Sequence, residues 1–387
     1  MLAESAGPLT SKAREMLDFV SARAEQTERD RKVPDEVVAE MKRAGMFRAF
    51  QSRRFRGLES HPADFFGAIV ELASACPSTG WILGIMGIHQ FELANLPLQL
   101  QEDVLAEDPD TLISSSYGPQ GTVTRVEGGF MLSGQWKSSS GVDHAGWVVL
   151  GGVEPPAEPD GKPAPRIFYV PLSQASVLDD WYVMGLGGTG SKSVVLEEVF
   201  VPEHRSSVRG GFQGRDESTP RVNDAPLYRL PQGLMYLLPG AAPAIGAARG
   251  AYQVYVQQLL KRRPRMDGKS ASEDPFVQTR LARAKLLIDT AEERMMSSID
   301  EMMETTVCGK DMEPGDFARF MWDFSRPGEE CVEAVRLLFE TMGASAVYST
   351  NPLQRFYRDV LTMRQHGTQD PGRGALVVAR TELGLGA

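Results

Sequence analysis

The feature that most constrains the fold is a change in the hydrophobic period along the chain. In residues 9–110 apolar side chains recur at helical spacing, as they do around Met16. From about residue 111, short β-branched runs separated by Gly and Pro turns replace that pattern. The helical period returns at about Tyr228 and continues to the C-terminus. This order predicts an α+β protein, mostly α, with its strands confined to the middle.

Three domains follow from these changes of period. We expect an N-terminal helical domain (1–110), a central antiparallel β domain (111–226) and a C-terminal four-helix bundle (227–387). The polar, turn-rich segment 210–226 is interpreted as a loop or lid. Long helices with apolar stripes on more than one side usually form a bundle and often pack against other subunits.

Composition limits the classes of function. The formal net charge of −10 at pH 7 argues against a protein that binds nucleic acid or an anionic membrane surface. No apolar run approaches the length of a membrane span. Three scattered cysteines without metal-ligand spacing favour free thiols in a reducing cytoplasm, and they predict no metal site.

A histidine ends the most informative helical pattern. Apolar Phe356, Val360 and Met363 recur at helical spacing, and His366 follows just before the stop signal Gly367. A packed helix would hold this imidazole while it faced the space beyond the helix end, which suits a catalytic base. The same pattern also fits a histidine that merely caps a helix C-terminus, where the dipole favours its charged form.

One glycine-rich string imitates a nucleotide-binding motif. Residues 185–190 satisfy GxGxxG, but a dinucleotide fingerprint needs a helix immediately after it. Here the β-branched run 194–200 follows, which predicts a strand and argues against a Rossmann site. The sequence also lacks a P-loop, HExxH, a CxxC pair and GxSxG, so an NTPase, a metal enzyme and a serine hydrolase have no support.

Two serine clusters lie beside predicted strands. Ser114–Ser116 end one strand, and Ser138–Ser140 follow Trp136 in another. Hydroxyl and backbone N–H groups at strand ends can bind the polar edge of a flat heterocycle, while Trp81 or Trp136 covers its apolar part. A solvated turn is the alternative interpretation of either cluster.

The remaining histidines divide into one candidate and three without an assigned role. His89 stands eight residues after Trp81 in a helix that is apolar all round, so the two side chains share roughly one face. A hydrogen-bonded core histidine is the alternative for His89. A surface role is expected for His144, and none is assigned to His61 or His204.

Several strings resemble the acyl-CoA dehydrogenase superfamily, and the resemblance covers essentially the whole chain. They are 128–136, 188–203 and the pair formed by 357–359 with 367–368. Dehydrogenases of that family often carry a glutamate just before this Gly-Thr, where His366 stands here. A carboxylate suits abstraction of an α-proton from a thioester, whereas an imidazole with a pKa near neutrality suits deprotonation of a phenol.

That departure resembles the oxygenase components of two-component (group D) flavin-dependent monooxygenases. The similar strings are 78–89, 136–144 and 358–366. The resemblance implies that a separate flavin reductase supplies reduced FMN or FAD, which reacts with O2. A C4a-hydroperoxyflavin would then hydroxylate an aromatic, phenolic substrate. It also implies a homotetramer.

The same resemblance implies roles for individual residues. His366 would be the base that removes the phenolic proton, and His89 would face the flavin or the substrate. Ser140 would lie near flavin N5, but the alignment leaves all three serines of 138–140 as candidates for that position. Cofactor contacts are expected from residues bordering the flavin ring or phosphate: Trp81, Ser115, Ser116, Trp136, Ser139, Ser140 and either Arg229 or Arg249.

Three alternatives stay open at this point. An N- or S-oxygenase of the same fold would keep the oxygen chemistry on a different substrate. A true acyl-CoA dehydrogenase would need its base elsewhere. A non-catalytic flavin-binding or helical scaffold protein would bind reduced flavin without turnover.

Overall fold

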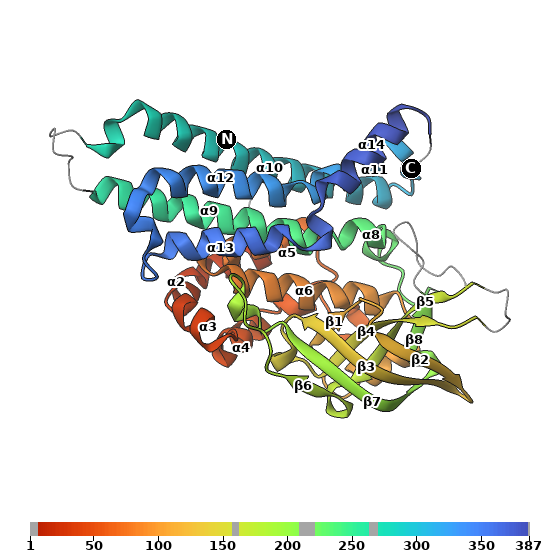
Figure 1. Cartoon of the computed structure of the whole chain (residues 1–387). Helices are drawn as coiled ribbons and strands as arrows, with labels where there is room; N and C mark the ends of the chain where they lie inside the picture. Colours follow the sequence, from red (N-terminus) through yellow and green to blue (C-terminus); the bar gives the residue numbers. More distant parts are fainter. Residues whose placement is uncertain (1–6, 157–161, 209–220, 263–269, 386–387) are drawn as a thin grey trace.

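Amphipathic helices form both ends of the chain and leave the strands in the middle. The computed structural model describes residues 7–156, 162–208, 221–262 and 270–385. In Figure 1 the long C-terminal helices run side by side along one side of the molecule, and the strands lie on the other. The expected fold class is confirmed: a helical region, a central and largely antiparallel β region, and a helical bundle.

The N-terminal region contains seven helices among the described residues. They are α1 (Pro8–Glu15), α2 (Leu17–Ser21), α3 (Ala24–Asp30), α4 (Asp35–Arg43), α5 (Pro62–Ala75), α6 (Pro77–Ala94) and α7 (Leu98–Leu105). Nearly every residue of α6 is buried, as its all-round apolar character predicts. Pro77 occupies its first turn and Cys76 is the extended N-cap, because the ring of proline pre-sets φ for N1.

The β region consists of two four-stranded sheets. Their strands are β1 (Ile113–Ser116), β2 (Gly121–Val126), β3 (Gly129–Ser139), β4 (Trp147–Glu154), β5 (Ala164–Pro171), β6 (Ser176–Leu178), β7 (Lys192–Pro202) and β8 (Ser206–Val208). The sheet orders are β1-β4-β5-β8 and β2-β3-β7-β6. One pair departs from the expected antiparallel pattern, since β1 and β4 are parallel. This is possible because a long connection that includes a second sheet's hairpin separates them.

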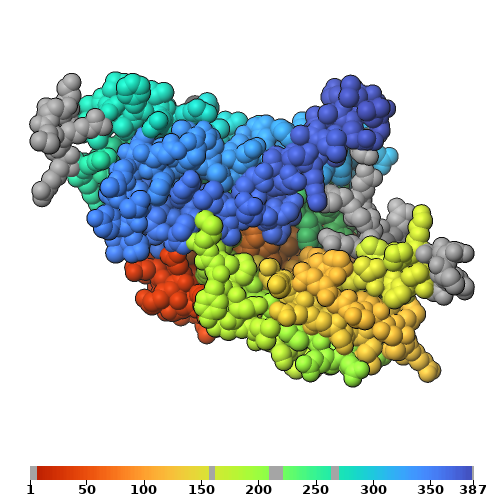
Figure 2. Space-filling model, viewed as in Figure 1, coloured from red at the N-terminus to blue at the C-terminus, as the bar shows by residue number. Residues whose placement is uncertain are grey.

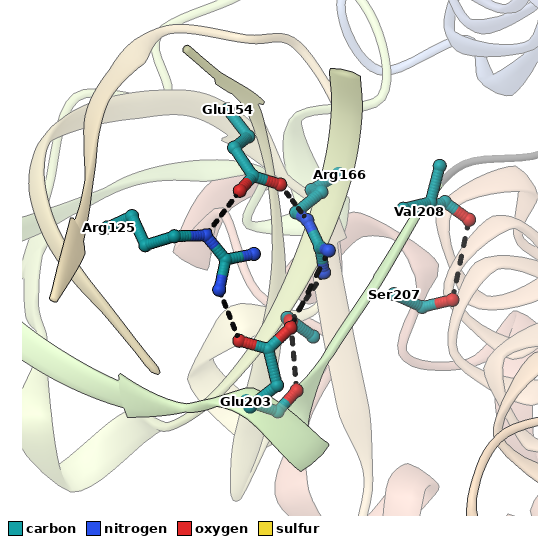
Figure 3. A network of polar contacts seen from close by, with 7 residues as sticks. Arg125, Glu154, Arg166, Glu203, Ser207 and Val208 are labelled. Carbon is teal, nitrogen blue, oxygen red and sulfur yellow. Dashed lines mark hydrogen bonds and ion pairs between the residues drawn. The ribbon is translucent and has the colours of Figure 1, made fainter. Parts of the chain in front are cut away.

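A network of charged side chains joins the two sheets (Figure 3). Arg125 on β2 binds Glu154 on β4 through Nε–Oε1 (2.6 Å) and Glu203 through Nη1–Oε2 (2.9 Å). Arg166 on β5 contacts the same two carboxylates. Both guanidinium groups also lie over the ring of Phe130. The network therefore fixes the relative position of the sheets at their outer end.

The C-terminal region is a bundle built on four long helices. The α-helices described in this region are α8 (Gln232–Met235), α9 (Leu238–Lys261), α10 (Pro275–Val307), α11 (Pro314–Ser325), α12 (Pro327–Met342), α13 (Pro352–Arg364) and α14 (Pro371–Glu382). In the bundle, α9 and α12 contact each other, and each also contacts α10 and α13. Small residues let α9 approach α5 closely, since a Cβ on Gly246 would lie 2.3 Å from the Val70 carbonyl oxygen.

Helix α6 lies between the bundle and the strands. It contacts α9 on one side and β1 and the loop before β7 on the other. The N- and C-terminal helices share one apolar core, and the β region has a separate core around Trp136. Side chains on α6 are therefore placed where the two parts of the molecule meet.

The structure leaves two of our expectations untested. The predicted lid, 210–226, falls largely outside the described residues, and the three domain boundaries stay a prediction. Within the described ranges, no helix is both long enough and apolar enough to cross a membrane.

We expect Arg166→Leu to lower the free energy of unfolding by about 2 kcal/mol, because it leaves the nearly buried Glu154 carboxylate short of a charged partner. Chemical denaturation would measure the change. Arg29→Ala is the matched control, since the Arg29–Asp30 pair is exposed and its loss should cost less than about 0.5 kcal/mol. Equal losses in the two variants would contradict a structural role for the network.

Candidate active site

Helix α13 delivers His366 to the junction between the bundle and the strands. The helix begins at Asn351, whose side chain accepts the Leu353 N–H at 3.0 Å, and its apolar stripe is buried. His366 lies just past the helix end, with Nδ1 2.8 Å from the Thr368 hydroxyl. The residue is solvent-exposed on one side. Its other side meets the ring of Trp81, edge to face, with ring centroids 5.3 Å apart.

Trp81 connects this imidazole to a chain of buried hydroxyl groups. Its indole N–H donates to Ser140 Oγ at 3.1 Å. Ser140 Oγ lies 2.8 Å from Ser191 Oγ, which lies 2.7 Å from Thr189 Oγ1. Thr189 in turn donates to the Leu186 carbonyl at 2.8 Å. The GxGxxG string thus forms a loop that supports Ser140, and strand β7 follows it as the sequence predicts.

Asp359 on α13 connects the helix before His366 to the loop that supports Ser140. Its buried carboxylate accepts the Leu186 N–H at 2.6 Å, and Leu186 is held at φ +56°. The neighbouring Arg358 donates to the Met184 carbonyl and pairs with Glu28 on α3. The helix that carries His366 is therefore bound to the loop that carries the hydroxyl chain. The positions of His366 and Ser140 are coupled through α13 as well as through Trp81.

Burial perturbs the pKa of Asp359 on α13 and of His366 just beyond it, and in both it favours the neutral form. It raises the pKa of Asp359 from 3.8 to about 7, although the Leu186 N–H and Arg355 favour the charged form. Desolvation lowers the pKa of His366 below its ordinary 6.5, despite the exposed side of the residue. The protein atoms packed around the ring cause this shift, so at pH 7 the imidazole is neutral and able to accept a proton.

A second polar cluster surrounds His89. Tyr117 OH lies 3.1 Å from His89 Nδ1, donates to Glu92 Oε2 at 2.8 Å and lies 2.8 Å from Tyr236 OH. Glu92 also accepts the hydroxyl of Tyr169 at 2.8 Å. Burial lowers the pKa of His89 to about 3. His89 Nε2 is itself buried and has no hydrogen-bond partner among the described residues.

The two serine clusters are brought together, but their hydroxyls do different things. Ser114 donates to the Ser140 carbonyl at 2.8 Å and contacts Ser139 Oγ at 3.2 Å. Ser116 donates to the Lys137 carbonyl at 2.6 Å, and Ser115 is buried on the same strand. Ser138 is exposed at a bulge with φ +66°, so among 138–140 it is Ser140 that meets Trp81.

Three predicted cofactor residues do not join these groups. Trp136 is fully buried in the β-region core, where its indole N–H donates to the Gly151 carbonyl at 2.7 Å. Arg249 is paired with Glu71 and Glu292 between helices. Arg229 is exposed near the start of the bundle, in the turn Pro226–Arg229. The prediction that they contact a cofactor stays a prediction.

The residues clustered around His89 were not predicted from the sequence. Glu92 carried a usable signal, since a carboxylate three residues after His89 stands out in a helix that is otherwise apolar. Tyr117 and Tyr236 come from distant segments and showed no comparable signal.

Figure 2 shows a recess between the blue C-terminal helices and the gold strands, with orange atoms of the N-terminal helical region visible within it.

Comparison with known proteins adds independent information. Residues 238–371 match the family model described as acyl-CoA dehydrogenase, C-terminal domain. The chain is 38% identical over 372 residues to the flavin-dependent monooxygenase oxygenase subunit HsaA of Mycobacterium tuberculosis, covering 96% of this chain and 94% of that one. It is 31% identical to the oxygenase component of the FADH2-dependent resorcinol hydroxylase of a Rhizobium species, covering 95% and 92% of the two chains.

Solved structures agree with these sequence relatives. The crystal structure of 3-HSA hydroxylase from Rhodococcus sp. RHA1 superposes with a TM-score of 0.91 at 35% identity. The match covers 98% of this chain and 97% of that one. The similarity therefore extends over all three parts of the fold.

We expect Asp359→Asn to stabilise the protein progressively, relative to the wild type, as pH rises. The folded state keeps a proton on Asp359 that the unfolded chain has already lost. The stability that the protonated Asp359 carboxyl contributes to the wild type is therefore fully present below about pH 4. It is lost as the pH rises through about 7. Asparagine keeps an acceptor for Leu186 and does not titrate, so the difference should grow by a few kcal/mol, roughly.

Urea unfolding of the wild type and the variant at about pH 4 and about pH 8 measures this difference. Asp311→Asn, at an exposed position, is the control, and its difference in stability from the wild type should stay nearly constant between these two pH values. A difference between Asp359→Asn and the wild type that stays constant across this range would show that the carboxyl is not protonated in the folded protein.

Proposed function

Because the chain belongs to the family of flavin-dependent monooxygenase oxygenase subunits, which share the acyl-CoA dehydrogenase fold, we propose that it hydroxylates a phenolic substrate. It is a monooxygenase that uses reduced flavin and O2, and a separate reductase component supplies the reduced flavin. The flavin is reduced FMN or FAD.

One observation carries the choice of a phenol. The helix end in which related dehydrogenases often carry a carboxylate bears His366, whose pKa is lowered by burial and whose ring rests against Trp81. His366 Nδ1 accepts the Thr368 backbone N–H at 3.4 Å and lies 2.8 Å from the Thr368 hydroxyl. A neutral imidazole is matched to a phenolic proton at neutral pH.

The residues present also fit a flavin ring. Buried neutral hydroxyls, an indole face and an unpartnered acceptor at His89 Nε2 suit a flat heterocycle with a polar edge. When bound, the reduced flavin activates O2 for transfer of one oxygen atom to the aromatic ring. Residues proposed to hold it are Trp81, Ser115, Ser116, Ser139 and Ser140, with Arg229 toward its phosphate.

The protein's own groups prepare the substrate. His366 removes the phenolic proton, which makes the neighbouring ring carbon more electron-rich. The Ser140–Ser191–Thr189 chain keeps the Ser140 hydroxyl oriented beside Trp81. The apolar faces of α6 and α9 exclude water from the junction, which protects reactive oxygen chemistry from hydrolysis. We leave Trp136 out of the site because its indole is enclosed in the sheet core.

Oligomeric state and compartment belong to the same proposal. Large apolar side chains are exposed on the bundle, among them Phe276, Leu286 and Tyr348, and such surfaces favour packing of bundle against bundle in a homotetramer. All three cysteines are unpaired, which favours a reducing cytoplasm.

We expect His366→Ala to reduce kcat for phenol hydroxylation about 100-fold or more, because general base catalysis contributes roughly that factor. Turnover with supplied reduced flavin, followed by product analysis, measures the loss. His61→Ser is the matched control, since His61 caps α5 at the surface and serine preserves that cap. An undiminished rate in His366→Ala across neutral pH would remove His366 from the role of base.

We expect no turnover with NADH or NADPH alone and hydroxylation when reduced flavin is supplied. In the sequence's only GxGxxG string, the Leu186 N–H donates to Asp359. A strand follows this string, so no helix N-terminus is available to bind a pyrophosphate. Oxygen uptake and product formation would be measured under both conditions. Hydroxylation by the isolated protein with a nicotinamide cofactor alone would contradict the two-component assignment.

A further inference from the structure

Glu92 is a buried carboxylate in the middle of the apolar helix α6. Three side chains donate to it: Tyr117 and Tyr169 to Oε2, each at 2.8 Å, and Gln232 to Oε1 at 3.0 Å. An ionised carboxylate accepts hydrogen bonds only, so it satisfies all three donors at once. Hydrogen bonds of this kind stabilise the charged form and offset the cost of burial. Glu92 therefore determines where the Tyr117 proton points.

The direction of the Tyr117 proton decides the protonation pattern of His89. A phenol has one proton, and Tyr117 gives it to Glu92. Toward His89 Nδ1, 3.1 Å away, the Tyr117 oxygen can then only accept, so Nδ1 carries the imidazole proton. The second lone pair accepts the Tyr236 hydroxyl at 2.8 Å. With Glu92 charged, these contacts place the Tyr117 proton toward Glu92 and the imidazole proton on Nδ1.

The other ring nitrogen is thereby left as an acceptor. Because burial lowers the pKa of His89 to about 3, the ring is neutral, and a neutral ring protonated at Nδ1 has a bare lone pair at Nε2. That Nε2 atom is buried and has no partner among the described residues. An unsatisfied buried acceptor destabilises the protein unless a ligand supplies the missing donor.

We propose that Glu92 and Tyr117 are positioning residues that hold His89 as the Nδ1–H tautomer, so that Nε2 accepts a hydrogen bond from an N–H or O–H group of the bound ligand. The assignment of the tautomer does not depend on the proposed function. Only the identity of the ligand rests on the proposed function. The two histidines then have separate tasks. His366 takes a proton, whereas His89 recognises a donor and exchanges no proton with it.

Magic-angle-spinning NMR of the full-length protein labelled with 15N-histidine tests the tautomer directly. Five histidines give few signals, and a His89→Gln sample identifies the His89 resonances. At pH 7, without flavin or substrate, Nδ1 should be protonated and Nε2 unprotonated. A protonated Nε2 in the wild type would overturn the proposal, whatever the enzyme's activity.

Two tyrosine variants separate the positioning role from general packing. Tyr117→Phe removes the acceptor for Nδ1–H, so the tautomer should change at least in part toward Nε2–H. Tyr236→Phe removes a hydroxyl from the same cluster but leaves the line from Glu92 through Tyr117 to His89 intact, and the tautomer should not change. An unchanged tautomer in Tyr117→Phe, or equal changes in both variants, would overturn the role of Tyr117.

A third variant tests the carboxylate. Glu92→Met releases the Tyr117 proton, which can then be donated to His89 Nδ1, so the Nε2–H tautomer should appear. If that variant does not fold, the tyrosine pair alone decides the proposal. A folded Glu92→Met protein with Nδ1 still protonated would remove Glu92 from the positioning role.

The source of the donor is found by adding ligands to the labelled wild type. Anaerobic addition of reduced FMN or FAD should shift the Nε2 resonance if a flavin N–H is the donor. Addition of p-cresol after the flavin should shift it if the donor is a phenol. A shift in either arm supports the acceptor role, and a shift in neither would overturn it. Product formation is not needed for this measurement, so it separates this inference from the proposed hydroxylation.

Discussion

The contact between the buried Asp359 carboxyl and the Leu186 N–H is the constraint on which the site depends. It joins helix α13 to a loop of the β region, two segments 173 residues apart in the chain. Through Thr189 and Ser191 the same loop supports the Ser140 hydroxyl, and through Trp81 that hydroxyl is connected to His366 at the end of α13. A closed circuit of this kind resists displacement of any one member, because each is held from two sides.

Burial gives the two histidines different chemistry from one physical cause. Desolvation disfavours the imidazolium in both and lowers the pKa of both. His366 stays exposed on one side, so a proton it receives can leave. His89 is enclosed and its Nδ1 is committed to Tyr117, so it retains one function, that of an acceptor. The separation of the two histidines follows from α6. His366 contacts Trp81 on this helix, and His89 lies about two turns further along it.

The sequence predicted the fold class well because hydrophobic period and turn residues are local properties. Helices such as Pro327–Met342 begin at a proline and are followed by a glycine, and both are local signals. The parallel pairing of β1 with β4 was missed because pairing depends on which segments meet in space. Of Ser138–Ser140, Ser138 lies at a bulge and Ser140 is the one that contacts the Trp81 indole, which the sequence could not show.

By itself the sequence determined that a histidine, His366, follows a packed helix, that the GxGxxG string precedes a strand, and that an apolar helix carries His89. Only the tertiary structure decided what these groups contact. Tyr117 and Tyr236 come to the cluster around His89 from distant segments, and Trp136 is enclosed in a core instead of joining them. Hydrogen-bond direction and desolvation are set by neighbours distant in the chain, and residue spacing carries no record of those neighbours.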